Sequence, residues 1–165
     1  MIKFYTASYD ASVYLQQPVQ NTGRDPLLEI AKTYYGDIKD INRALLKFDI
    51  LPISKSLAAG EISGSFRSYL NLRAAKSEEI PAEYTIYANA DSESWDMGLC
   101  IRFDNITTDG VSWRYRDGIN KWQEYTTGGS AIYAAGVTGS ANAEGGVWYT
   151  ASQASQSYSY QSDDI

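Results

Sequence analysis

The chain has 165 residues, a formal net charge of −6 and a pI near 4.6, and 44% of its residues are hydrophobic. This composition is typical of one globular domain, and an acidic chain without a Lys/Arg cluster is not expected to bind nucleic acid. Histidine is absent, which excludes Ser-His-Asp and Cys-His catalysis and His-based metal sites. No apolar run approaches the roughly 20 residues that a membrane-spanning helix needs, so no membrane partner is expected.

The single cysteine, Cys100, cannot form a disulfide within the chain. We expect it to be a small buried apolar residue, which is the common role of an isolated thiol. The N-terminal sequence lacks the charged and then apolar order of a secretion signal. These features favour assembly in the cytoplasm of a cell over a disulfide-stapled secreted protein.

Tyrosine is unusually frequent, with 14 copies, and it accompanies many small and β-branched residues that suit strands. The first predicted strand covers residues 11–15, and the Pro-, Asn- and Gly-containing stretch 18–23 predicts a loop. Residues 25–35 could begin a short helix at Pro26, but aromatic and β-branched residues in the second half favour a strand. A turn is predicted at Tyr35-Gly36-Asp37.

An apolar run at residues 44–50 ends at Leu51-Pro52, and residues 53–59 could form a helical turn. Further strands are predicted at 66–73, 83–88 and 111–116, the last lying between turns at 109–110 and 117–118. In 111–116, Val111, Trp113 and Tyr115 alternate with polar residues. A Gly- and Ala-rich loop is predicted at 126–140, and strand patterns return at 147–150 and 155–160.

Strands at this spacing, with no sustained helical stripe, predict an all-β sandwich or barrel in a single domain spanning 1–165, with one or two short helical turns. The order of several short motifs supports a more specific interpretation. The motifs are Asp10-Ala11-Ser12-Val13-Tyr14, Pro18 with Asn21-Thr22-Gly23, Leu28-Glu29-Ile30, residues 43–49, 69–72 and 84–87, and Ser94-Trp95.

These motifs resemble the DNRLRE-type domains. The amino-acid sequence of residues 5–36 is also similar to the versions of this domain that are found in tailed-phage virion proteins. The resemblance implies an antiparallel jelly-roll β-sandwich that works as an appended module. Such domains usually continue into a further strand and a Trp-containing segment, whereas this sequence stops at Ile165. The resemblance therefore predicts that the chain is the N-terminal part of a longer one, or that a neighbouring chain supplies the closing strand.

Three acidic groups were considered as sites: Glu78-Glu79, the set Asp91, Glu93 and Asp96, and Asp163-Asp164. Their spacing does not single out a catalytic pair, so no enzymatic activity is expected. The middle set could offer oxygen ligands to a structural calcium ion, although the usual 12-residue Asp-rich loop is missing. No cofactor is otherwise expected, and no glycine motif for phosphate is present.

Aromatic residues are the best candidates for binding, because Trp and Tyr faces stack on sugars and anchor protein interfaces. Trp113 is expected in the core. Trp95 and Trp122 follow polar loops and are expected nearer an edge than Trp113, but core packing is favoured for each over a contact surface, which is the alternative; Tyr125 extends this group. Arg114 and Arg116 could pair with acidic groups within the domain or on a partner.

Two functions from different classes fit these features. The first is a structural component of a phage virion, such as a capsid decoration, neck, collar, tail or fibre module, present in many copies and bound to other virion proteins. The second is a carbohydrate-binding module for attachment to a glycan or cell surface. An enzyme would require carboxylates that converge in space from distant positions.

Overall fold

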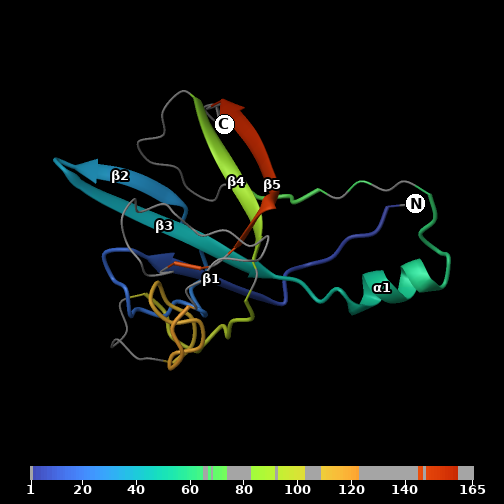
Figure 1. The fold of residues 1–165 in the computed structure, drawn as a ribbon, viewed down its shortest axis with the longest axis horizontal. Helices are drawn as coiled ribbons and strands as arrows, with labels where there is room; N and C mark the ends of the chain where they lie inside the picture. Colours follow the sequence, from blue (N-terminus) through green and yellow to red (C-terminus); the bar gives the residue numbers. More distant parts are fainter. Residues whose placement is uncertain are drawn as a thin grey trace.

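The computed structural model describes residues 2–64, 67, 69–73, 83–91, 93–102, 109–122, 145–146 and 148–159. Its elements are strands apart from one short helix, in agreement with the predicted all-β class. They are β1 (Tyr9–Tyr14), β2 (Ala31–Tyr35), β3 (Ile38–Lys47), α1 (Leu51–Ala58), β4 (Glu83–Asp91) and β5 (Trp148–Ser159). Two antiparallel sheets result, one in the order β1-β3-β2 and the other a β4-β5 pair (Figure 1).

The three-stranded sheet is organised around the long central strand β3. β2 and β3 form a tight hairpin in which Tyr35 pairs with Ile38 across Gly36 and Asp37. Gly36 adopts a positive φ of 63°, a conformation that glycine reaches without a steric penalty, so the predicted turn is confirmed. On the other side of β3, β1 runs antiparallel with Tyr9 opposite Lys47.

β1 is an edge strand whose open side is closed by a side chain. The Thr22 hydroxyl accepts a hydrogen bond from the Ser12 N–H at 3.0 Å and donates to the Ser12 carbonyl at 2.7 Å, as a neighbouring strand would. The Ser12 hydroxyl in turn accepts from the Glu29 N–H at 2.8 Å. The loop after β1 therefore covers this edge, and an edge covered in this way is protected against pairing with other chains.

The core lies between this sheet and irregular segments from residues 95–102 and 109–122, which are yellow to orange in Figure 1. Ala11 and Val13 of β1 are fully buried in it. From the irregular segments come three tryptophans and a valine: Trp95, Trp113, Trp122 and Val111. The core position predicted for Trp113, which is 1% exposed, is confirmed.

The strand predicted at 111–116 is wrong. The Ser112 N–H donates to the Tyr115 carbonyl at 2.8 Å, and the Ser112 hydroxyl accepts from the Tyr115 N–H at 3.1 Å, so the chain turns back on itself. Ser112 is buried beside Val111 and Trp113 instead of facing outward. The apparent alternation of apolar residues arose because several sides of this turn pack against the core.

Asn21 joins three irregular segments inside the protein. Its amide nitrogen donates to the carbonyls of Met97, at 2.8 Å, and Val111, at 2.7 Å. Its amide oxygen accepts from the N–H groups of Gly23 and Cys100. The Asn21 side chain is therefore fully satisfied although it is completely buried, which makes it a fixed polar junction.

Several other predicted elements differ from the structure. Residues 69–73, predicted as part of a strand, form no regular element, and of residues 25–35 only 31–35 form a strand, so the helix starting at Pro26 is absent. The helical turn predicted near 53–59 is present within α1, with Pro52 in the first turn. The loop predicted at 126–140 lies outside the described residues.

β4 confirms the strand predicted at 83–88 and continues to Asp91, where it pairs with a single strand, β5. The two strands predicted at 147–150 and 155–160 thus belong, in their described residues, to one strand. Its pairing register shifts between Ala88 and Ala90, where β5 contains an irregularity. Such a bulge bends and twists the strand pair.

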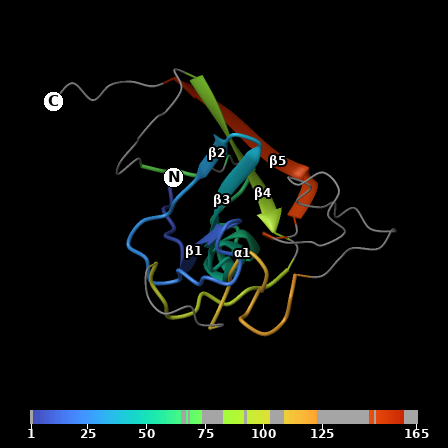
Figure 2. The same cartoon turned by 90° about the vertical axis from the view of Figure 1, so that its left-hand side faces the viewer.

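The helix stands apart from both sheets. In Figure 1, α1 and the N-terminal segment both extend beyond the end of β1 and β3, and Figure 2 views the molecule along this direction from the opposite end. The Lys3 ammonium donates to the Ser56 hydroxyl at 2.7 Å and to the Glu61 carboxylate at 2.8 Å, which fixes the N-terminal segment to α1. We refer to residues 2–7 together with α1 as the arm. No described helix is long and apolar enough to cross a membrane.

Candidate functional site

Trp95 and Trp122 do not lie at an exposed edge. Each is only 4% exposed, and both belong to the same core cluster as Trp113. The Trp122 indole N–H donates to the Ser112 carbonyl at 3.1 Å, so its polar group is also engaged. The favoured core packing of both tryptophans is confirmed, whereas their expected position near an edge is wrong, and neither ring presents a face to a ligand.

The two candidate arginines have different surroundings. Arg116 donates to the Ser94 carbonyl at 3.3 Å and lies 3.8 Å from the Asp117 carboxylate, which matches the pairing within the domain that the sequence allowed. The Arg114 N–H donates to the Pro18 carbonyl at 2.8 Å, and its side chain is partly buried. Neither arginine is grouped with the tryptophans into a site, and Tyr125 lies outside the described residues.

The predicted calcium ligands do not converge. The Asp91 carboxylate accepts a hydrogen bond from the Glu93 N–H at 3.1 Å, which closes a local turn. The backbone of Asp96 is bound to Arg116 and Val111. Within the described part of the chain, no three His, Cys, Asp or Glu side chains gather as they would around a metal ion.

A partly buried polar cluster around Tyr14, at the end of β1, was not anticipated from the sequence. The Arg102 guanidinium lies 4.9 Å from the centroid of the Tyr14 ring and forms an ion pair with Glu29. The Arg102 N–H also donates to the Asp25 carboxylate at 3.3 Å. Burial, assisted by the Glu29 carboxylate, raises the pKa of Tyr14 to about 12. These contacts hold residues 24–29 against residues 100–102.

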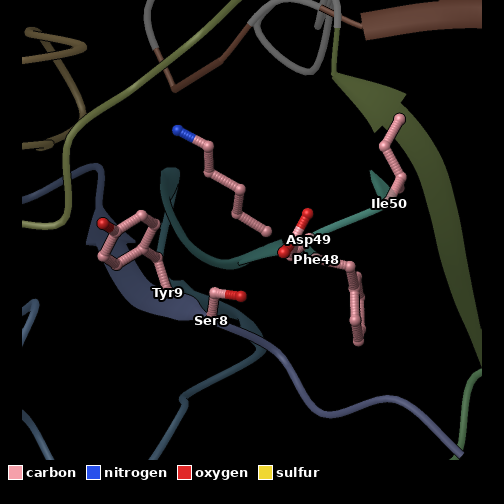
Figure 3. A pocket seen from close by; sticks show the side chains of 6 residues that line it. Ser8, Tyr9, Phe48, Asp49 and Ile50 are labelled. Carbon is pink, nitrogen blue, oxygen red and sulfur yellow. The ribbon is translucent and has the colours of Figure 1, made fainter. Parts of the chain in front are cut away.

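A hollow of about 400 Å³ lies where β1 begins and β3 ends (Figure 3). It is lined by Ser8, Tyr9, Lys47, Phe48, Asp49 and Ile50. Tyr9 and Lys47 are direct partners in the β1–β3 pairing, so their side chains lie on the same face of the sheet. The ammonium group of Lys47 accordingly lies 5.3 Å from the centroid of the Tyr9 ring.

Local backbone contacts fix the walls of the hollow. The Ser8 N–H donates to the Lys47 carbonyl at 2.7 Å, which extends the β1–β3 pairing by one residue. The Asp49 Oδ1 atom accepts from the Leu51 N–H at 3.0 Å and so satisfies one of the free donors at the start of α1. The Lys47 ammonium donates to the Trp95 carbonyl at 3.3 Å, which connects the hollow to the core.

The arm is a second candidate surface, and it is apolar. Ile2 and Phe4 are 81% and 83% exposed, and α1 contains no buried residue. Leu51 and Leu57 of α1 are also exposed. Several large exposed apolar side chains on one projecting element are a feature of surfaces that contact another protein.

In comparisons with protein-family models, curated proteins and solved structures, none matches this chain. The resemblance to DNRLRE-type domains therefore stays a prediction based on the short motifs of the sequence.

Proposed function

We propose that the chain is a structural protein of a tailed-phage particle, built as a jelly-roll module that holds other virion proteins through protein–protein contacts. The observation that carries this proposal is the arm, a projecting element whose apolar side chains have no cover from the described sheets. The sequence resemblance supplies the setting of a virus particle. Many copies in a symmetric particle would strengthen weak individual contacts through avidity.

The arm suits a docking role because it is connected to the domain yet separate from the core. The bonds from Lys3 to Ser56 and Glu61 hold the N-terminal segment beside α1, so both parts of the arm carry exposed apolar side chains. Since α1 buries no residue within the chain, its apolar side chains do not serve the core. Isolated helices of this length are marginal in water, and contact with a partner would stabilise α1.

Co-sedimentation of the purified chain with capsid and tail proteins tests this proposal. We expect binding that is unaffected by added sugars and that is lost in the double variant Phe4→Ser/Leu57→Ser. A matched control is Ile119→Ser, because Ile119 is 82% exposed but belongs to a loop outside the arm. Undiminished binding by the double variant would exclude the arm as the docking surface, and no binding by the wild type would contradict the proposed function.

Glycan binding through Trp95 and Trp122 receives no support from their placement, because both rings lie in the core. Protein–protein assembly is therefore preferred over a module that recognises glycans through tryptophan.

A further inference from the structure

We infer that β2 pairs with the β2 strand of a second copy of this chain, through the side that faces away from β3, which we call the outer edge. This inference goes beyond the proposed function, because it concerns contacts between copies at a surface apart from the arm. Figure 1 shows the β2–β3 hairpin at the end of the three-stranded sheet that lies away from α1. Three observations carry it: the outer edge is open, its sequence is complementary to itself, and the other edge of the sheet is closed.

The hydrogen bonds of β3 establish which backbone groups of β2 point outward. The Leu15 N–H donates to the Ile41 carbonyl at 3.0 Å, so the odd-numbered residues of β3 bond to β1 and the even-numbered ones bond to β2. Thr33 pairs with an even-numbered residue and therefore bonds to β3. The N–H and C=O groups of Lys32 and Tyr34 consequently point away from β3. β2 is the last strand of its sheet, and no backbone group of the described residues bonds to this outer edge.

The side chains on the outer edge restrict which strand can pair with it. Lys32 and Tyr34 lie on the same face of β2 and are both exposed, Tyr34 at 61%. The Lys32 ammonium lies 5.8 Å from the centroid of the Tyr34 ring, near the outer limit of a cation–π contact. A lysine on an edge strand opposes pairing with most other strands. A partner strand must therefore offer this lysine a matching group.

β2 offers that group when it pairs antiparallel with its own copy. With Thr33 opposite Thr33 of the second copy, all residues of β2 are paired and each Lys32 faces the Tyr34 ring of the other copy. The backbone groups of Lys32 and Tyr34 would then exchange N–H···O=C bonds across the contact. A register centred on Lys32 would instead place two ammonium groups opposite each other, and one centred on Tyr34 would place Lys32 against the Gly36 turn.

The closed edge of the sheet limits this assembly to two copies. The Thr22 hydroxyl bonds to the N–H and the carbonyl of Ser12, so the outer side of β1 is occupied. Pairing through β2 gives a continuous sheet in the order β1-β3-β2-β2-β3-β1, whose outer strands are both covered. A two-fold contact of this kind closes instead of extending into a fibre. A strand of five residues buries less area than a tight dimer needs, so we expect association at high protein concentration.

The test is amide hydrogen exchange of the purified ¹⁵N-labelled chain, with sedimentation velocity, over a roughly hundredfold range of protein concentration. We expect the dimer fraction to rise and the amides of Lys32 and Tyr34 to exchange more slowly as it does. The Thr33 amide is the internal control, because it bonds to β3 in the monomer as well. A chain that stays monomeric overturns the inference and leaves the edge to a strand of another protein. A dimer with unchanged exchange at Lys32 and Tyr34 overturns it too, because the copies then meet elsewhere.

Two variants block the outer edge without removing a bond inside the sheet. Lys32→Pro removes an N–H that points outward, which an edge strand tolerates. Tyr34→Lys brings a second ammonium opposite each Lys32. Each should weaken association at least roughly tenfold. Ile38→Lys is the matched control, because it adds the same charge at a side chain that is 60% exposed but pairs with Tyr35 inside the hairpin. Wild-type association by Lys32→Pro and Tyr34→Lys with unchanged melting temperatures would contradict the inference.

Cross-linking tests the register. Opposed Thr33 residues would form a non-hydrogen-bonded pair with Cα atoms about 4.5 Å apart, which a disulfide can bridge. Thr33→Cys should therefore form a disulfide-linked dimer under mild oxidation. Lys32→Cys, at a more exposed position, should do so far more slowly, because the two copies of residue 32 would be diagonal neighbours about 7–8 Å apart. Cys100 is buried, so the wild type should not cross-link. Faster cross-linking of Lys32→Cys than of Thr33→Cys would overturn the inferred pairing, whatever the result for particle proteins.

Discussion

The Arg43 guanidinium lies 4.4 Å from the centroid of the Trp113 ring, and its Nη1 atom donates to the Gly145 carbonyl at 2.8 Å. This arrangement connects β3 to the irregular layer that completes the core. Burial lowers the pKa of Arg43 to about 10, which still leaves it charged at neutral pH. A charged guanidinium that is held between a ring and a carbonyl stabilises both segments.

Arg43→Met keeps an apolar stem but removes the charge and the hydrogen bond. We expect the free energy of unfolding to fall by about 2–4 kcal/mol, from the lost cation–π contact and the carbonyl left without its donor. Urea unfolding followed by tryptophan fluorescence measures this change. Arg24→Met is the control, since Arg24 is exposed and should change stability by less than about 0.5 kcal/mol. Equal effects of the two variants would contradict a special role for Arg43.

The packing around the Asn21 junction predicts that alanine is tolerated much less well at Gly98 than at Gly36. A Cβ atom at Gly98 would lie 2.3 Å from the Asp109 carbonyl oxygen and 2.4 Å from the Asn21 Oδ1 atom, whereas one at Gly36 would meet nothing within 4 Å. Both glycines have positive φ, so both alanine variants carry the same kind of backbone strain.

Gly98→Ala should therefore lower the melting temperature far more than Gly36→Ala, whose cost is limited to about 1 kcal/mol of strain. Differential scanning calorimetry of the two variants provides the comparison. Similar melting temperatures would show that the backbone around Asn21 can move aside, and the proposed rigidity of this junction would then be wrong.

Tyr14 predicts a loss of stability at high pH. Its pKa is about 12 in the folded chain and near 10 when exposed, so between these values the unfolded chain has lost the proton that the folded chain keeps. Stability contributed by the neutral phenol is thus present below pH 10 and decreases as the pH rises toward 12. Tyr14→Phe should show a smaller decrease in unfolding free energy over this interval, measured by denaturant titration. An identical pH dependence in both proteins would contradict the raised pKa.

The position of the arm predicts that a substitution in α1 weakens binding to a partner without changing the stability of the folded chain. Because α1 buries no residue, Leu57→Ser should change the unfolding free energy by less than about 0.5 kcal/mol. The same variant should weaken binding to particle proteins in the co-sedimentation experiment. If Leu57→Ser lowered the unfolding free energy as much as a core substitution such as Val13→Ala, α1 would have to pack against the sheets, and the arm would not be separate from the core.

The sequence predicted the local elements that depend on neighbouring residues. The Gly36 turn, the strands near 11–15 and 83–88, and the helical turn at 53–59, which lies largely within α1, all follow from turn chemistry or short-range pattern. It could not distinguish a strand at 111–116 from a buried turn, because both place apolar residues at alternate positions. Only the hydrogen bonds of Ser112 separate the two.

The candidate site was harder to predict, for a physical reason. Trp95 and Trp122 follow polar loops, which suggested a position near an edge of the core, but the direction of a loop is set by distant contacts such as those of Asn21. The hollow depends on the pairing of Tyr9 with Lys47, residues separated by a hairpin and a loop. The one available signal was local: Phe48-Asp49-Ile50 places apolar and acidic residues together before the predicted helix.

Quantitative mass spectrometry of purified particles tests the proposed function most directly. Under the proposed function, the particles are those of the tailed phage whose genome would carry the coding sequence, separated from the soluble lysate on a density gradient. We expect the chain to sediment with the particles in a fixed ratio to the major capsid protein. A chain found only in the soluble fraction, while the capsid and tail proteins are recovered in the particles, would contradict its assignment as a virion structural protein.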